Sequence, residues 1–237
     1  GVDFGGKMIY QDFKNNNIPL EKSVVIKKKE FYNFFNGMKK IQDETYKILK
    51  DGKFPLILGG DHSISYGSIK GSLKYYKNNL HVLWIDSHTD INTNKSSLTK
   101  SKHGMPVSSL MNFNDEDWGL NEKNILQPQQ LTYLGINSVD EYEKKIINKK
   151  KIDYIHRDEI FIKPLYDFIP EGIPIHISFD VDSIHKDLVP CTGTPTERAL
   201  DPEFVNMIID HFKGRIVSMD IVEYNPFIGN VEDSKMS

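Results

Sequence analysis

Short apolar, β-branched runs alternate along the chain with segments in which apolar residues recur at helical spacing. The first helical segment extends from about residue 30 to residue 49, and another begins near Ser63. A further helix begins at Asp201-Pro202, because proline is favoured in the first helical turn. The apolar runs predict strands at 54–59, 81–86, 131–136, 173–180 and 215–222. This alternation predicts an α/β fold of three α/β/α layers with a mostly parallel central sheet.

The chain shows no internal repeat and no Pro/Gly-rich linker, so we expect residues 1–237 to form a single domain. Residues 93–102 are rich in Ser, Thr, Lys and Asn and lack any apolar periodicity. They predict a long loop, and loops of this length often carry function.

Charge and composition exclude several classes of partner. The net charge of −3 provides no overall basic field, so a nucleic acid is not expected as a partner. The lysine runs at 27–29 and 149–151 are interpreted as solvated surface. No apolar run is long enough for a membrane span, and a single cysteine, Cys191, excludes an intrachain disulfide. These features favour a cytoplasmic protein.

Three motifs place acidic or histidine side chains directly after predicted strands. In residues 86–90 (Asp-Ser-His-Thr-Asp), alternate side chains would share one face of a strand or of an extended turn. Residues 180–182 (Asp-Val-Asp) repeat this spacing, and residues 60–63 (Gly-Asp-His-Ser) add an imidazole beside a tight glycine turn. Parallel sheets form their ligand sites at the carboxyl ends of the strands, so we expect these side chains to meet there.

The motifs together supply carboxylates and imidazoles from Asp86, Asp90, Asp180, Asp182, His62 and His88. Such acids repel one another when no cation is present, but they become ligands for divalent metals. The absence of a thiolate favours Mn²⁺ over structural Zn²⁺, and the number of acids suits two ions that activate a water between them. Each motif alone is more often a cap or a surface group, so the metal-site hypothesis depends on the combination.

In this order, the motifs resemble the signature motifs of the arginases. The resemblance extends from about Phe54 to Pro226 and includes 59–63 (Gly-Gly-Asp-His-Ser), 86–93 (Asp-Ser-His-Thr-Asp-Ile-Asn-Thr), 103–106 (His-Gly-Met-Pro), 178–182 (Ser-Phe-Asp-Val-Asp) and 223–226 (Glu-Tyr-Asn-Pro). It implies an arginase-like catalytic domain over residues 1–237, shorter at its ends or loops than a complete family member. The implied reaction is hydrolysis of L-arginine to L-ornithine and urea.

The resemblance also implies a cofactor of two Mn²⁺ ions per chain and a role for each ligand. The implied ligands are His62 and Asp90 for one ion, His88 and Asp182 for the other, and Asp86 and Asp180 as bridges between both. A hydroxide bridging the metals would attack the guanidinium carbon of the substrate.

Three residues receive catalytic roles from the same resemblance. Asp90 would pass the hydroxide proton to the leaving amine, and His103 would shuttle protons, a role that suits the ordinary pKa of histidine. Glu223 would hold the substrate guanidinium through a charge-assisted hydrogen bond.

Substrate choice is expected in the loop after Asp90. Asn92, Ser97 and Thr99 match positions that receive the α-carboxylate in arginases. Asp140 resembles the acid that senses the α-amino group, and Thr194 resembles a residue that lines the site. Ordinary loop solvation is the competing interpretation of these polar side chains.

Two functional alternatives stay open at this point. One is an agmatinase or another ureohydrolase acting on a different guanidino substrate, and the other is a catalytically silent metal-binding homologue. Ser138 stands where arginases often have an aspartate, which affects the assignment of the α-amino site. The resemblance also suggests a homotrimer.

The remaining histidines and the cysteine are interpreted as structural. His81 and His176 lie in predicted strands, so we expect hydrogen-bonded core imidazoles there. Cys191 is expected to be a small buried residue rather than a reactive thiol.

Overall fold

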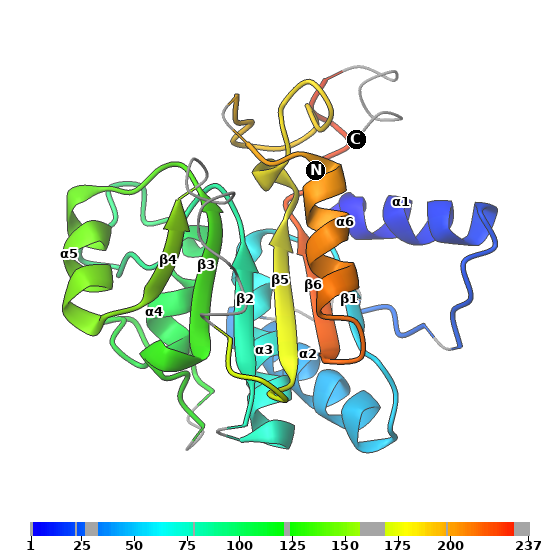
Figure 1. Cartoon of the computed structure of the whole chain (residues 1–237), viewed down its shortest axis with the longest axis horizontal. Coiled ribbons are helices and arrows are strands. Elements are labelled where there is room, and N and C mark those ends of the chain that lie inside the picture. Colours follow the sequence, from blue (N-terminus) through cyan, green and yellow to red (C-terminus); the bar gives the residue numbers. More distant parts are fainter. Residues whose placement is uncertain are drawn as a thin grey trace.

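A parallel six-stranded sheet forms the centre of the computed structural model (Figure 1). The structure describes residues 2–21, 23–26, 33–77, 79–120, 124–156, 169–197 and 199–229. The strands are β1 (Leu56–Leu58), β2 (His81–Ile85), β3 (Leu131–Ile136), β4 (Asp153–His156), β5 (Ile175–Asp180) and β6 (Ile216–Val222). They lie in the order β1-β6-β5-β2-β3-β4, and every neighbouring pair is parallel.

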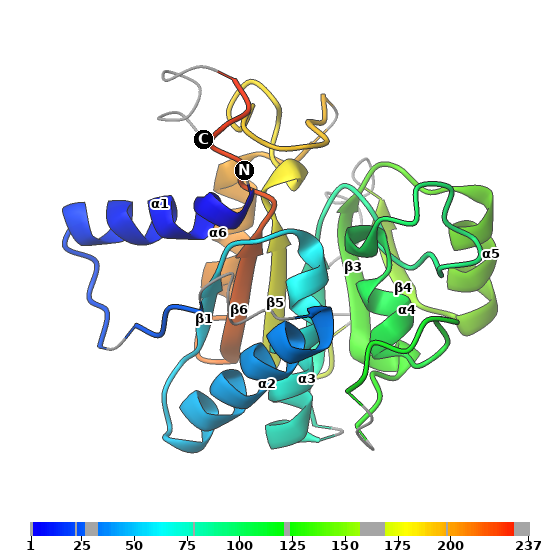
Figure 2. The same cartoon turned by 180° about the vertical axis from the view of Figure 1, so that it is seen from behind.

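Helices cover both faces of this sheet (Figures 1 and 2). On one face lies α6 (Pro202–His211), and on the other lie α2 (Phe34–Lys50), α3 (Ser65–Tyr76) and α4 (Pro106–Leu110). The helix α5 (Glu141–Lys150) lies beside β4, and α1 (Val2–Asn15) extends outward near the end of β1. The predicted three-layer α/β/α class is therefore confirmed.

The central strands β2, β3 and β5 are almost completely buried because both of their faces are covered. All five residues of β2 are buried, and its four apolar residues alternate between the two cores. Val82 and Trp84 pack with the residues of α2 and α3, whereas Leu83 and Ile85 pack with those of α6. Complete burial of such side chains stabilises the fold by roughly 1.5–3 kcal/mol each. This two-sided burial explains why the strand lacks the alternation of a half-exposed strand.

The elements with strong apolar patterns were predicted within a few residues. The helix expected at 30–49 is α2, which begins at Phe34 after an Asn33 side chain that accepts the N–H of Asn36. The beginning of the predicted segment, residues 30–32, lies outside the described residues. The expected loop at 93–102 is largely irregular, and only its last residue begins a short 3₁₀ turn.

The apolar pattern did not predict α1, α4, α5 and β4. The helix α5 buries only Glu143 and Ile147, so its apolar period is too sparse to recognise. The strand β4 is short and lies at the sheet edge, where only Ile155 is fully buried. Edge elements of this kind carry little hydrophobic pattern.

Two consecutive glycines form the predicted turn after β1. Gly59 and Gly60 have φ values of 94° and 99°, a region that disfavours residues with a side chain. Gly59 also lies against α1, because a Cβ added to it would come within 2.5 Å of the Cα of Gly6. The glycines therefore allow both the turn and the close approach of α1.

Across the described residues, every helix is too short or too polar to cross a bilayer.

Candidate metal centre

Four neighbouring strands bring the predicted site residues to one edge of the sheet. Asp86 follows β2 directly, Asp180 ends β5 and Glu223 follows β6 directly. His62 lies four residues beyond β1, in the short 3₁₀ turn that begins after the two glycines. Because β1, β6, β5 and β2 are adjacent in the sheet, side chains far apart in sequence meet at their carboxyl ends.

Turns, rather than an extended segment, aim the paired acids into the site. The backbone N–H of His88 donates to Asp86 Oδ1 at 2.8 Å, and that of Asp182 donates to Asp180 Oδ1 at 2.8 Å. Asp90 has a left-handed backbone with φ of 47°. Of the two predicted geometries for residues 86–90, the strand is therefore wrong, because β2 ends at Ile85 and local side-chain-to-backbone hydrogen bonds bend the chain after it. The side chains nevertheless converge.

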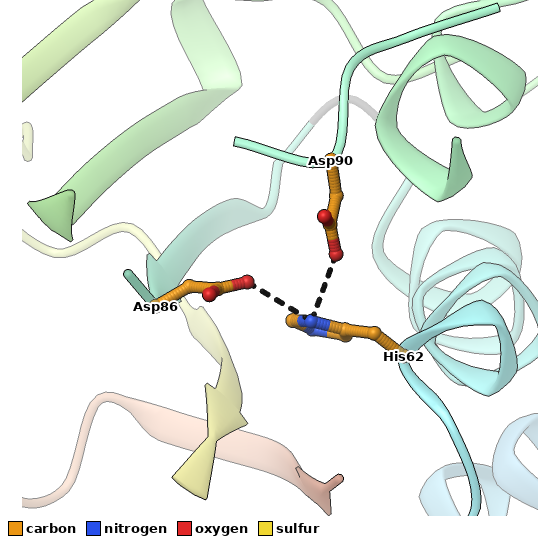
Figure 3. Close-up of side chains that lie close together, drawn as sticks. All are labelled: His62, Asp86 and Asp90. Carbon is orange, nitrogen blue, oxygen red and sulfur yellow. Dashed lines mark ion pairs between the residues drawn. The ribbon is translucent and has the colours of Figure 1, made fainter. Parts of the chain in front are cut away.

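The first group of candidate ligands surrounds the imidazole of His62 (Figure 3). Its Nδ1 lies 3.0 Å from Asp86 Oδ2 and 3.1 Å from Asp90 Oδ2. The same nitrogen also lies 3.2 Å from Asp180 Oδ2. Within the described part of the chain, this buried nitrogen has no partner at hydrogen-bond geometry. A buried imidazole nitrogen that faces three carboxylate oxygens has the donor set that a divalent cation requires.

The second group lies around His88 and shares Asp86 with the first. His88 Nδ1 lies 3.1 Å from Asp182 Oδ2 and 3.5 Å from Asp86 Oδ1. The ligand atoms lie within 4.8 Å of one another both in the set His62, Asp86 and Asp90 and in the set Asp86, His88 and Asp182. Two overlapping groups with one common carboxylate suggest a binuclear metal site, and Asp86 has the position expected of a bridging ligand.

Asp180 belongs to neither of these two groups, although it was predicted to bridge both metals. Its Oδ2 faces His62 on the side of the first group. Its contact with the second group is through the backbone, where its Oδ1 accepts the N–H of Asp182. The bridging role of Asp180 therefore stays a prediction.

Burial and crowding strongly perturb the pKa values of these acids. Burial and the charge of Asp86 raise the pKa of Asp90 to about 7. Burial and the charges of Asp182 and Asp86 raise the pKa of Asp180 well above its usual value. Burial acts on Asp86 in the same direction, but the imidazoles of His62 and His88 outweigh it and lower its pKa. Cations among the carboxylates would relieve this repulsion.

The neighbouring carboxylates raise the pKa values of the two histidines. Burial lowers the pKa of His88, but Asp182 and Asp86 outweigh it and raise that pKa to about 12. Burial also lowers the pKa of His62, but its three carboxylate neighbours outweigh burial and raise that pKa well above the ordinary value. In the metal-free protein the two imidazoles therefore supply the positive charge of the cluster.

Several supporting residues were missed by the sequence analysis. Trp84 donates its indole N–H to Asp86 Oδ2 at 2.9 Å, and its ring stacks on His62 with centroids 4.1 Å apart. Ser178 Oγ lies 3.0 Å from His62 Nε2 and donates to Asp220 Oδ1 at 2.7 Å. These contacts fix the ring of His62 so that its other nitrogen faces the acids. Trp84 shares a strand face with Asp86, two residues later, and this spacing is a signal that could have identified it.

The predicted core histidines are confirmed. His176 is fully buried, with Nε2 2.9 Å from Asp220 Oδ2 and Nδ1 2.7 Å from Ser218 Oγ. His81 is also buried, and its Nε2 lies 2.9 Å from Thr132 Oγ1. Cys191 is completely buried, as expected for a small core residue.

Glu223 and His103 lie together next to the first ligand group. Glu223 Oε1 accepts the backbone N–H of His62 at 2.7 Å and lies 3.3 Å from His103 Nδ1. Hydrogen bonding to Glu223 raises the pKa of His103 against the effect of its partial burial. The side chain of His103 is 46% exposed, so it reaches both solvent and the buried acid. This position is suitable for the transfer of protons between them.

The structure pairs the predicted substrate-binding residues with one another or with the ligands. Asn92 donates its Nδ2 hydrogen to Asp140 Oδ2 at 2.8 Å, so two residues 48 positions apart meet. The hydroxyl oxygens of Ser97 and Thr99 lie 3.5 Å apart. Thr194 donates its hydroxyl to Asp182 Oδ2 at 2.5 Å and therefore supports a candidate ligand directly.

The fold and the site together define a class of protein: a three-layer α/β/α domain with a candidate binuclear metal centre at the carboxyl ends of its parallel strands. Comparison with known proteins narrows this class. The model of the arginase family matches residues 6–236, and the chain belongs to this family.

Curated relatives include arginases from fungi and from a malaria parasite. The chain is 35% identical to an arginase of Neurospora crassa over 84% of its own length and 36% identical to an arginase of Plasmodium berghei over 76%. It spans only 60% and 55% of the length of these two relatives, respectively.

Solved arginase structures have the same fold. The crystal structure of the Bacillus subtilis arginase matches with a TM-score of 0.87 at 26% identity, covering 100% of this chain and 89% of the other. The Entamoeba histolytica arginase in complex with L-ornithine matches with a TM-score of 0.85 at 26% identity, with the same coverage.

Proposed function

We propose that this protein hydrolyses L-arginine to L-ornithine and urea at a pair of Mn²⁺ ions. The observation that carries the proposal is the pair of ligand groups that share Asp86 beside Glu223 and His103. Such a site combines metal ligands, a buried acid for a cationic substrate and a solvent-accessible proton carrier. Membership of the arginase family supports the same reaction.

Six residues would hold the metals. His62 and Asp90 would bind one ion, His88 and Asp182 the other, and Asp86 and Asp180 both. The buried Nδ1 of His62, which faces three carboxylate oxygens, supports the first ion, and the carboxylate-rich set without a thiolate supports Mn²⁺. When bound, the two ions would supply a nucleophilic hydroxide near neutral pH.

The protein side chains would bind the substrate and move its protons. Glu223 would accept hydrogen bonds from the substrate guanidinium, and neither of its contacts described above uses Oε2. Asp90 would accept a proton and pass it to the leaving amine. The half-exposed His103 would then exchange protons with solvent.

The polar residues beyond the metal centre would recognise the amino-acid end of the substrate. We propose that Asn92, Ser97 and Thr99 receive the α-carboxylate and that Asp140 receives the α-amino group. The hydrogen bond from Asn92 to Asp140 supports this proposal. The α-carboxylate and the α-amino group are attached to the same carbon atom, so the residues that bind them have to lie next to one another. Thr194 would line the site from its position on Asp182.

The test is urea release by the Mn²⁺-loaded protein, with metal content measured by elemental analysis. We expect two metal ions per chain, turnover of L-arginine, and far slower turnover of agmatine, which lacks the α-carboxylate. Asp180→Ala should abolish turnover, because it removes a carboxylate that faces His62. Faster turnover of agmatine would assign an agmatinase instead. If the metal-loaded wild type hydrolyses neither substrate, the protein is a silent metal-binding homologue.

We also propose that the protein is a cytoplasmic homotrimer, on the basis of its resemblance to arginases and of its composition. Sedimentation equilibrium would measure the assembly, and a monomeric mass at micromolar concentration would contradict it.

A further inference from the structure

Two consecutive side chains hold one end of residues 92–102, which we call the recognition loop because it carries the residues proposed to bind the α-carboxylate. The backbone N–H of Asn94 donates to Asn114 Oδ1 at 3.0 Å, and that of Lys95 donates to Asp115 Oδ1 at 2.9 Å. Each hydrogen bond joins the recognition loop to a segment 20 residues later. Both donors are backbone N–H groups, so these contacts hold the loop without using its side chains.

The next residue of that segment holds the other end of the recognition loop. Glu116 forms an ion pair with the ammonium group of Lys102, the last residue of the loop. The same ammonium group lies 4.9 Å from the ring centroid of Phe34 and 5.5 Å from that of Trp118. Because His103 follows Lys102 directly, this contact fixes the chain next to the proposed proton carrier.

The three side chains, Asn114, Asp115 and Glu116, form a clamp that is itself anchored to the core. Asn114 donates its Nδ2 hydrogen to Ser109 Oγ in α4 at 2.9 Å. Shortly after the clamp, Trp118 is only 3% exposed and packs edge-on against neighbouring aromatic rings. In contrast, Leu98 at the tip of the recognition loop is 99% exposed. The loop therefore has little core of its own, and the clamp connects it to a rigid part of the molecule.

We propose that Asn114, Asp115 and Glu116 are positioning residues that set the preference for a substrate with an α-carboxylate. The inference rests on the proposed function and extends it to a segment outside the motifs. With the clamp in place, the polar groups of the recognition loop are ordered before the substrate arrives. Without it, substrate binding has to order the loop, which weakens binding of the carboxylate end only.

The kinetic test uses Asp115→Ala and Asn114→Ala, with Asp117→Ala as the matched control. Asp117 lies in the same segment and is exposed, and its Oδ1 accepts the N–H of Gly119 rather than an N–H of the recognition loop. For each clamp variant we expect the KM for L-arginine to rise at least about tenfold with little change in kcat, because Asp115→Ala removes one hydrogen bond to the loop and Asn114→Ala removes one to the loop and one to Ser109. The KM for agmatine should stay unchanged, because agmatine has no carboxylate for the loop to bind. The control should match the wild type for both substrates.

Two kinetic results would overturn the proposal. One is an equal loss for L-arginine and agmatine, which would indicate general damage to the site. The other is a change in Asp117→Ala as large as that in Asp115→Ala, which would indicate a nonspecific charge effect.

Hydrogen exchange of the metal-free protein tests the clamp without any turnover. The amides of Asn94 and Lys95 should exchange faster in Asn114→Ala and Asp115→Ala, respectively, while the strands keep their protection. Unchanged exchange at these amides would refute the clamp. A wild type that leaves L-arginine intact would instead refute the proposed function and, with it, the substrate part of this inference.

Discussion

Binding of metal to the stripped protein should release protons, because the candidate ligands hold them in the metal-free state. His88 has a pKa of about 12, and the pKa of His62 is also raised well above its ordinary value. Near neutral pH both imidazoles are therefore protonated. In each case the nitrogen that faces the carboxylates is Nδ1, which has to lose its proton before it can bind a cation.

The magnitude follows from this proton count. Release of two imidazolium protons makes the combined affinity for the two ions rise about 100-fold per pH unit, or about 2.7 kcal/mol. Asp90, with its pKa of about 7, adds up to half a proton at pH 7 and less at higher pH, and any proton held by Asp180, whose pKa is also raised, adds to this minimum. Metal affinity should increase with pH. Because the pKa values of the two imidazoles are raised, rising pH removes the protons that compete with the metal and strengthens its binding.

Isothermal titration of Mn²⁺ into the stripped protein, in buffers of different ionisation enthalpy between pH 6.5 and 8, would count these protons. We expect at least two per chain in the wild type and one fewer in His88→Asn. The control His185→Gln should keep the wild-type number, because His185 is paired with Asp187 rather than with the cluster. A count near zero across this range would refute the reasoning, because it would show that the imidazoles are neutral before metal binds.

Three further predictions concern stability and metal affinity. Removal of metal should lower the melting temperature: saturation at 100 times Kd stabilises the fold by about 2.7 kcal/mol, which corresponds to roughly 5–10 °C for a chain of this size. Equal melting with and without Mn²⁺ would contradict a metal site. Asp220→Ala should destabilise the metal-free fold by about 3–5 kcal/mol in urea denaturation, because it removes the buried carboxylate that accepts from the side chains of Ser65, Ser68, Ser178 and His176. Burial by itself would raise the pKa of Asp220. The hydrogen bond and the electrostatic attraction between Asp220 and His176 outweigh burial and lower the pKa of Asp220. The Asp220 carboxylate therefore stabilises the fold near neutral pH, and this stabilisation is lost as the pH falls through the lowered pKa. If the difference in the free energy of unfolding between wild type and variant instead grew toward acid pH, the assignment would be contradicted. Trp84→Phe keeps an aromatic ring against His62 but removes the donor to Asp86, so competition with a chelating dye should show metal affinity about tenfold weaker. An unchanged affinity would mean that this hydrogen bond does not tune the ligand.

Local pattern predicted the parts of the fold that are buried on two sides. The strand at 131–136 was predicted with its observed bounds because all of its residues are buried. The helix α5 and the edge strand β4 were missed because few of their side chains are buried, so their sequences have no clear apolar pattern. Their positions depend on contacts with neighbours that the local sequence does not encode.

The site shows the same division. The glycine turn before His62 and the positions of Asp86 and Asp180 at strand ends could be read from the sequence, because they depend on backbone conformation within a few residues. The bend after Asp86 could not, because an extended segment and a turn offer the same alternation of acidic side chains. Nor could the contact of Ser178 with His62, because it crosses from one strand to the turn after another.

The sequence by itself determined which chemical groups are present and that each follows a strand. Only the tertiary structure decided which of them come into contact. The strand order β1-β6-β5-β2 brings the N–H of His62 to 2.7 Å from Glu223 Oε1, although 161 positions separate the two residues. Neighbours in a parallel sheet are chosen by the packing of whole strands and helices, so the distance between two strand ends is a property of the complete fold.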